Sequence, residues 1–163
     1  MRILVDVLRA RASADALAPA LVKLDSSATP SAARAAQATE NVWRAIDEEF
    51  TLLSSTQVAA ALGAKSGNRS YASDQRAARR ILGVRRLNSY LYPGFQFDRA
   101  TGTVKPAVPA LLRAAERAGR SDEGLALWLV GPTTYLGGDR PVDHLDEVDR
   151  VVKVAEDAWG VEW

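Results

Sequence analysis

Basic residues gather in one short segment of the chain, and their side chains suit contact with a nucleic acid. From Lys65 to Arg86 there are seven basic residues and one acid, Asp74, a local net charge of 7 − 1 = +6. The whole protein carries only +1, so the rest of the chain sums to +1 − 6 = −5. Arginine can neutralise phosphates or bind guanine with two hydrogen bonds, and asparagine or glutamine can bind adenine. The residues expected to contact duplex DNA are Lys65, Asn68, Arg69, Gln75, Arg76, Arg79, Arg80, Arg85 and Arg86.

Two short helices are expected to carry the first part of this segment. Ser54 or Ser55 can cap a helix of small and aliphatic residues, which Gly63 can end in the left-handed conformation. A turn follows over residues 65–68, and a second helix is predicted from about Arg69 to Ile81. Helical spacing places most arginines of the second helix on one broad face.

A β-hairpin is predicted directly after the second helix. Residues 84–92 follow a strand–turn–strand pattern, with Asn88 and Ser89 near the turn. Helix, turn, helix and hairpin in this order are typical of a winged helix-turn-helix, so residues 54–98 are predicted to form a DNA-binding unit. The alternative is a solvated basic face that binds no nucleic acid, which is the usual role of a charged run.

The composition is that of an ordinary globular protein. The chain has 163 residues, 47% hydrophobic and 25% charged, enough for one domain or two small ones. The absence of cysteine excludes disulfides and thiolate chemistry and fits a cytoplasmic location. The first twenty residues include Asp6 and several arginines, which makes a poor signal peptide. No apolar run approaches the roughly twenty residues that span a bilayer, so no membrane contact is expected.

The N-terminal part, residues 1–53, is predicted to form two helices. Leucines recur at helical spacings over residues 1–24. Thr29 can cap a second helix that begins at Pro30 and runs to about Leu53. Two helices ahead of a DNA-binding unit can join two copies into a homodimer, or they can simply cover the core. Both readings stay open at this point.

The C-terminal part is predicted to be a small helical domain over residues 104–163, after a polar turn at residues 99–103. Expected helices begin near Pro106, after a capping Ser121, and near Asp146, and the last ends at Trp159. The fold class is therefore mainly α, with an N-terminal helical arm, a winged helix-turn-helix with a short β-hairpin, and this C-terminal domain.

Groups that could perform catalysis are scarce. His144, the single histidine, lies between Asp143 and Asp146, which suggests a catalytic triad or a metal ligand. One histidine without cysteine cannot build a typical structural zinc site, and no nucleophile motif or phosphate-binding loop is present. We therefore expect no enzyme activity, no metal and no cofactor, and a structural role for His144 near the last helix.

The C-terminal third carries a more specific pattern. It consists of Leu127-Trp128-Leu129, Pro132, the run from Leu136 to Leu145 (LGGDRPVDHL), and a valine-rich last helix that ends in Gly160-Val161. This pattern resembles the Xre/MbcA/ParS toxin-binding domain of bacterial antitoxins over roughly residues 104–163. The resemblance implies binding to a cognate toxin protein, often a RES-domain enzyme that consumes NAD. The front of the chain differs from the family's usual all-helical DNA-binding unit.

The end of the chain is also expected to bind the partner. Trp159, Val161 and Trp163 place two indoles and a branched side chain at the terminus, and tryptophan is enriched among binding hot spots. The alternative is that the tail docks on its own core. The residues expected to bind the partner are Trp128, Tyr135, Arg140, Trp159, Val161 and Trp163.

These observations favour an antitoxin-like DNA-binding protein that neutralises a toxin and represses its own operon. One alternative is a protein–protein adaptor whose basic face contacts an acidic partner without binding DNA. A second is a phage-type transcriptional regulator that has no toxin partner.

Overall fold

The computed structural model of the chain describes residues 29–65, 68 and 70–160. The chain divides into two compact units, Met1–Asn41 and Val42–Trp163. The described residues are mainly helical with small antiparallel sheets, which confirms the mainly α class. The predicted helix over residues 1–24, and with it the leucines proposed for dimerisation, lies outside the described residues. No described helix combines the length and apolar character that crossing a membrane requires.

Helix α2 spans Pro30–Phe50 and begins where the sequence predicts. The Thr29 hydroxyl caps it by accepting a hydrogen bond from the Ala32 N–H at 3.2 Å. The predicted end near Leu53 is wrong, because Thr51 takes a φ of +66° and directs the chain into a strand. Only the first part of α2, up to Asn41, belongs to the first compact unit.

Helices α3 (Ser55–Ala61) and α4 (Tyr71–Ala77) form the predicted pair. Ser54 caps α3 in a reciprocal capping box with Gln57, and Gly63 follows with the expected positive φ of +67°. The second helix is shorter than predicted. It ends at Ala77 rather than Ile81, because Arg79 takes a φ of +56° and ends the helical run.

A three-stranded antiparallel sheet has the order β1-β3-β2. Its strands are β1 (Leu52–Leu53), β2 (Val84–Arg86) and β3 (Ser89–Pro93). The predicted hairpin is confirmed: Arg86 pairs with Ser89, which leaves Leu87 and Asn88 as the turn. The short helix η1 (Gly94–Gln96) leads into a second hairpin of β4 (Phe97–Asp98) and β5 (Thr103–Val104).

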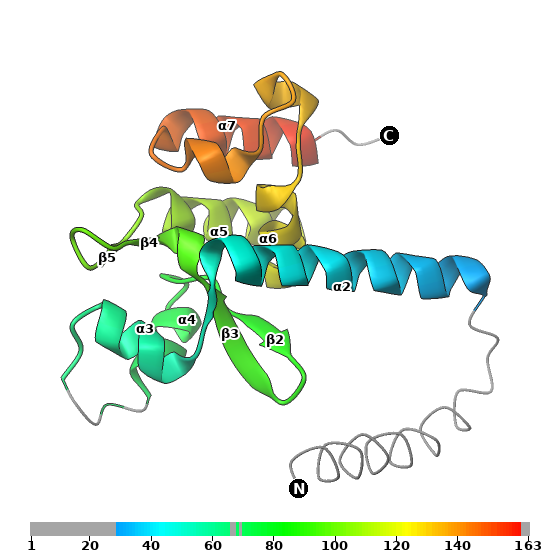
Figure 1. Cartoon of the computed structure of the whole chain (residues 1–163). Helices are drawn as coiled ribbons and strands as arrows, with labels where there is room; N and C mark the ends of the chain where they lie inside the picture. Colours follow the sequence, from blue (N-terminus) through cyan, green and yellow to red (C-terminus); the bar gives the residue numbers. More distant parts are fainter. Residues whose placement is uncertain (1–28, 66–67, 69, 161–163) are drawn as a thin grey trace, which may run out of the picture. The chain divides into compact units, whose positions relative to one another are not determined.

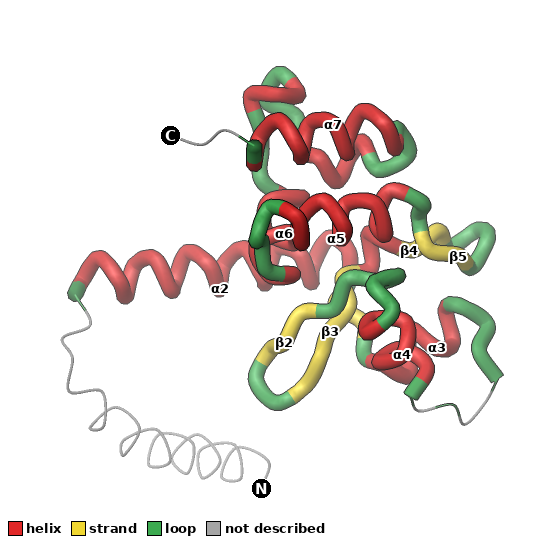
Figure 2. The backbone as a smooth tube through the Cα atoms, turned by 180° about the vertical axis from the view of Figure 1, so that it is seen from behind, coloured by secondary structure: helices red, strands yellow, loops and turns green. Residues whose placement is uncertain are grey.

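Three α-helices complete the second unit. They are α5 (Ala107–Arg117), α6 (Asp122–Val130) and α7 (Val148–Trp159). The predicted cap is confirmed, since the Ser121 hydroxyl accepts a hydrogen bond from the Gly124 N–H at 3.0 Å. Between α6 and α7 lie the short helices η2 (Thr134–Leu136) and η3 (Pro141–His144). Figures 1 and 2 show α7 on one side of α5 and α6, with α3, α4 and the β2–β3 hairpin on the other.

The second unit has two clusters of buried side chains. The larger joins Trp43 and Ile46 of α2 to the inner faces of α5, α6 and α7. The smaller lies under α3 and α4 and holds Val58, Ala72, Ile81, Tyr92 and Phe97. Val104 packs against both clusters, so the polar turn at residues 99–103 falls within one compact unit. The division into residues 54–98 and 104–163 stays a prediction about function.

Gln96 is the one buried polar side chain among the described residues. Its amide oxygen accepts a hydrogen bond from the Leu82 N–H at 2.7 Å. Its amide nitrogen donates to the carbonyls of Leu82 at 2.8 Å and Pro93 at 2.9 Å. The side chain thus joins the two ends of the β2–β3 hairpin, and all three of these hydrogen bonds are buried.

Candidate nucleic-acid interface

Three basic side chains of the predicted DNA-binding set point into solvent. Lys65 follows α3, Arg80 follows α4, and Arg85 lies on β2. All three are exposed, and within the described residues none of them has an ion-pair partner. We call these three the outward basic residues. A cation without a partner in its own protein can neutralise a phosphate and release the counterion condensed on the DNA, which is a large source of affinity for DNA.

Arg76 lies instead between α4 and the hairpin. Its guanidinium is stacked on the ring of Tyr90, 3.7 Å from the centroid. Its stem crosses Gly83 so closely that a Cβ at that glycine would come within 2.6 Å of Arg76 Cδ. This cation–π contact joins α4 to the hairpin. The structure thus assigns Arg76 a contact inside the protein, and its predicted phosphate contact is untested.

Arg79 is also held by the protein. One guanidinium nitrogen donates to both carboxylate oxygens of Asp122, at 2.8 and 3.0 Å. Another donates to the Leu112 carbonyl at 3.3 Å. About a third of the Arg79 side chain, 31%, is exposed. The residue therefore joins the end of α4 to α5 and the first turn of α6, where a carboxylate also favours the helix dipole.

The conformation of Arg79 explains why α4 is short. The Arg80 N–H donates to the Gln75 carbonyl and the Arg79 N–H to the Arg76 carbonyl, both at 3.0 Å. These two bonds form a Schellman motif, whose left-handed position is usually a glycine. Arg79 occupies that position with a φ of +56°.

The remaining predicted residues lie near these groups. Arg86 is half-buried, with its guanidinium 5.1 Å from the ring centroid of Trp43. Asn68 is exposed at the approach to α4, and its Oδ1 lies 3.2 Å from the Ser70 hydroxyl, so the amide N–H₂ faces away from that bond. Gln75 is half-buried on α4. Arg69 lies outside the described residues.

Sequence reasoning missed one feature of the hairpin. Leu87, the first turn residue, is 95% exposed and has a φ of +54°. Leucine rarely adopts this conformation, and turns of this length usually carry asparagine or glycine there. The signal in the sequence was the pair Leu87-Asn88 where a hairpin prefers Asn-Gly.

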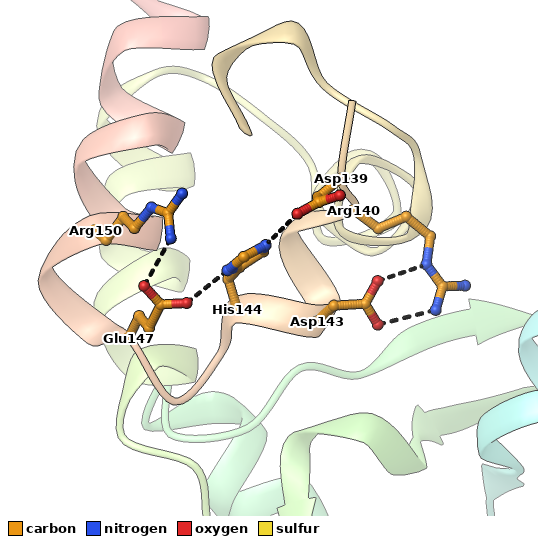
Figure 3. Close-up of polar contacts among 6 residues, drawn as sticks. All are labelled: Asp139, Arg140, Asp143, His144, Glu147 and Arg150. Atoms are coloured by element: carbon orange, nitrogen blue, oxygen red, sulfur yellow. Dashed lines mark hydrogen bonds and ion pairs between the residues drawn. The ribbon is translucent and has the colours of Figure 1, made fainter. Parts of the chain in front are cut away.

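The C-terminal motif forms a network of ion pairs around Arg140 and His144 (Figure 3). Arg140 binds two carboxylates, Glu49 at the end of α2 and Asp143 in η3, with four hydrogen bonds of 2.9 Å. Hydrogen bonds from Arg140 lower the pKa of both carboxyl groups below their ordinary values. The acidic end of α2 thus obtains the partner that the helix dipole requires.

His144 is hydrogen-bonded on both ring nitrogens to carboxylates of its own protein. Its Nδ1 lies 2.6 Å from Glu147 and its Nε2 lies 3.1 Å from Asp139. These hydrogen bonds, with Glu147 first, raise the pKa of His144 above its ordinary value of 6.5. Glu147 is itself bound by Arg150 at 2.8 Å. In the described residues, no group of three or more His, Cys, Asp or Glu could hold a metal ion.

Some of the predicted partner-binding residues pack against their own protein, and others are exposed. Trp128 packs edge-on against Trp159, with ring centroids 4.9 Å apart, and Trp159 lines a groove with Arg117 and Glu156. Tyr135 in η2 is 47% exposed. Arg140 contacts its own protein, as described above. Val161 and Trp163 lie outside the described residues.

Comparison with known proteins found a structure with a similar fold. The fold is similar to that in the NMR structure of Rv2175c, with a TM-score of 0.57. The sequences are 24% identical, and the match covers 68% of this chain and 82% of that chain. At this level of identity the similarity concerns the fold alone. No family model and no curated protein matches the chain.

Proposed function

We propose that this protein binds duplex DNA with a winged helix-turn-helix made of α3, α4 and the β2–β3 hairpin. The observation that supports this most is the set of outward basic residues, Lys65, Arg80 and Arg85. They lie on three consecutive parts of one helix–turn–helix–hairpin unit and lack ion-pair partners among the described residues. Within this unit Arg76 links α4 to the hairpin through Tyr90, and Arg79 links the end of α4 to α6 through Asp122.

In this proposal the start of α4 approaches the base edges. Asn68 lies three residues before this helix, and its exposed side chain could reach a base edge there, since helix-turn-helix proteins contact bases with the first residues of the second helix. The outward basic residues then supply phosphate contacts on either side. Such contacts position the protein, whereas base contacts specify the sequence.

A salt titration of binding to the DNA upstream of the protein's own gene tests the proposal. Replacing Arg80 or Arg85 with Ala removes one phosphate contact each, so we expect the slope of log K against log salt to fall by about 0.9 per substitution. Arg113→Ala is the matched control, because Arg113 is exposed on α5 and loses the same charge outside the proposed interface.

Two results would contradict DNA binding through this surface. The first is wild-type protein that fails to bind duplex DNA at low salt, which would favour the adaptor alternative. The second is an equal loss of affinity from Arg113→Ala, which would indicate a general charge effect.

A second candidate function is capture of a protein partner by the C-terminal helices, as in an antitoxin. The specific observation is Tyr135, an exposed aromatic residue on the short helix η2 within the motif that resembles toxin-binding domains. The Thr133 hydroxyl accepts a hydrogen bond from the Tyr135 N–H at 3.4 Å and fixes this turn. A tyrosine side chain has few rotatable bonds, so its ring buries a large area at little entropic cost.

Co-expression with the product of the neighbouring gene, which this candidate function requires to be a toxin, provides the test. We expect Tyr135→Ala to weaken neutralisation by about tenfold or more, and Tyr135→Phe to retain it, because the ring supplies most of the buried area. Neutralisation by Tyr135→Ala at the wild-type level would exclude Tyr135 from the interface.

A further inference from the structure

Leu87 combines two unfavourable features at the tip of the β2–β3 hairpin. Its side chain is 95% exposed, against 47% for Tyr135 and 37% for Val42, the other exposed large apolar residues described. Its φ of +54° lies in the left-handed region, which is strained for a residue with a Cβ. An asparagine at this position would relieve both the exposure and much of the strain. The turn requires the positive φ but not a leucine, so keeping this strained and exposed side chain points to a function at this position.

The hairpin that carries Leu87 has a fixed base. Tyr90 is stacked on Arg76 at 3.7 Å, and Gln96 bonds to both sides of the hairpin base. Figures 1 and 2 show the hairpin turn directed away from α5, α6 and α7. The tip is therefore a single apolar side chain on a rigid support.

The surroundings of Leu87 are polar and basic. Its neighbours Arg85, Asn88 and Ser89 are all exposed. A stable protein interface requires a patch of about 800 Å² on each side, and this tip offers one leucine without an apolar surround. DNA, in contrast, is contacted in the minor groove by single apolar wedges flanked by basic residues.

We propose that Leu87 is a wedge that enters the minor groove and partly unstacks one base step, which kinks the bound DNA. This inference rests on the DNA-binding function proposed above. Arg85, exposed two residues before Leu87, would neutralise a phosphate at the edge of the same groove. Pyrimidine–purine steps unstack most easily, so the wedge would favour a TA or CA step and add specificity without a base-edge hydrogen bond.

The test compares Leu87→Asn with the wild-type chain on duplexes of about 30 bp that carry a central TA step, taken from the DNA upstream of the gene. Energy transfer between dyes at the duplex ends measures the bend, and 2-aminopurine at the step reports unstacking. We expect the wild-type protein to bend and unstack the duplex. We expect Leu87→Asn to lose most of both signals and about tenfold in affinity, with an unchanged salt slope. Leu87→Phe should keep the bend, because it retains an apolar wedge.

The outcomes separate the wedge from the DNA-binding proposal. Wild-type protein that binds the duplex without bending it, and a Leu87→Asn variant that binds equally well, would overturn the wedge and leave DNA binding intact. No binding by the wild-type protein would overturn both. A lower melting temperature for Leu87→Asn would show that Leu87 packs within the fold. A change in sedimentation on substitution would show that it joins two copies. Either of these last two results also overturns the wedge.

Discussion

Arg79 allows the backbone and the ion pair at the end of α4 to be tested separately. Among the described α-helices, α3, α4 and α5 end in the same Schellman motif, with Gly63 after α3, Arg79 after α4 and Gly119 after α5. Arg79→Gly keeps the left-handed backbone and removes the ion pair with Asp122. Arg79→Ala removes the ion pair and keeps a Cβ in the left-handed conformation.

The size of each effect follows from the geometry. The side chains of Arg79 and Asp122 are 31% and 25% exposed, so the ion pair is partly buried. Its stabilising energy should lie between that of a surface ion pair and that of a buried one. With two hydrogen bonds to the carboxylate and one to a carbonyl, their loss should cost about 2 kcal/mol of the free energy of unfolding. Glycine removes a left-handed strain of about 1 kcal/mol. We therefore expect Arg79→Ala to lose about 2 kcal/mol and Arg79→Gly about 1 kcal/mol.

Urea denaturation, followed by circular dichroism, measures both variants. A double-mutant cycle with Asp122→Ala should give a coupling energy of about 1–2 kcal/mol. Equal stabilities of the glycine and alanine variants would refute the strain argument. A coupling near zero would refute the ion-pair argument. The salt slope of DNA binding should not change in Arg79→Gly, in contrast to Arg80→Ala, because Arg79 is already paired.

Two further predictions concern stability. Gly94→Ala would place a Cβ 2.1 Å from the Phe50 carbonyl oxygen, so we expect a loss of about 2–4 kcal/mol in urea denaturation; Gly63→Ala, in open space at a φ of +67°, should lose only about 1 kcal/mol. A smaller loss at Gly94 than at Gly63 would contradict the close approach. Hydrogen bonds to Glu147 and Asp139 raise the pKa of His144, so its contribution is complete below the ordinary pKa of 6.5 and is lost as the pH rises through the raised value. The wild-type melting temperature should therefore fall more steeply above pH 6.5 than that of His144→Gln; parallel pH profiles would exclude the effect.

Local signals in the sequence predicted where most elements begin. Three predicted caps are present in the structure: Thr29, Ser54 and Ser121. A cap needs only a side-chain oxygen close in sequence to free N–H groups, so it can be predicted locally. Gly63 marks a helix end for the same local reason. The strand–turn–strand pattern after Gly83 likewise predicted the hairpin.

The roles of individual arginines could not be read from the sequence. Arg79 ends α4 without a glycine, and its partner Asp122 is 43 residues away. Arg76 stacks on Tyr90 only because the hairpin folds back against the helix. A segment charge of +6 therefore overstates the number of cations available to DNA, since some of them are used within the fold. Such pairings depend on tertiary structure, which helical spacing in the sequence cannot predict.

Gln96 sets how freely the hairpin can move before it meets a ligand. Two of its buried hydrogen bonds hold Leu82 to Gln96 across the base of residues 83–95, and the third binds Pro93 within that segment. The hairpin is thus preorganised, so docking it loses little conformational entropy, and more of the contact energy remains as affinity. We expect the Leu82 amide to exchange its hydrogen far more slowly than the turn amides at Leu87 and Asn88, since only opening of the whole base exposes it.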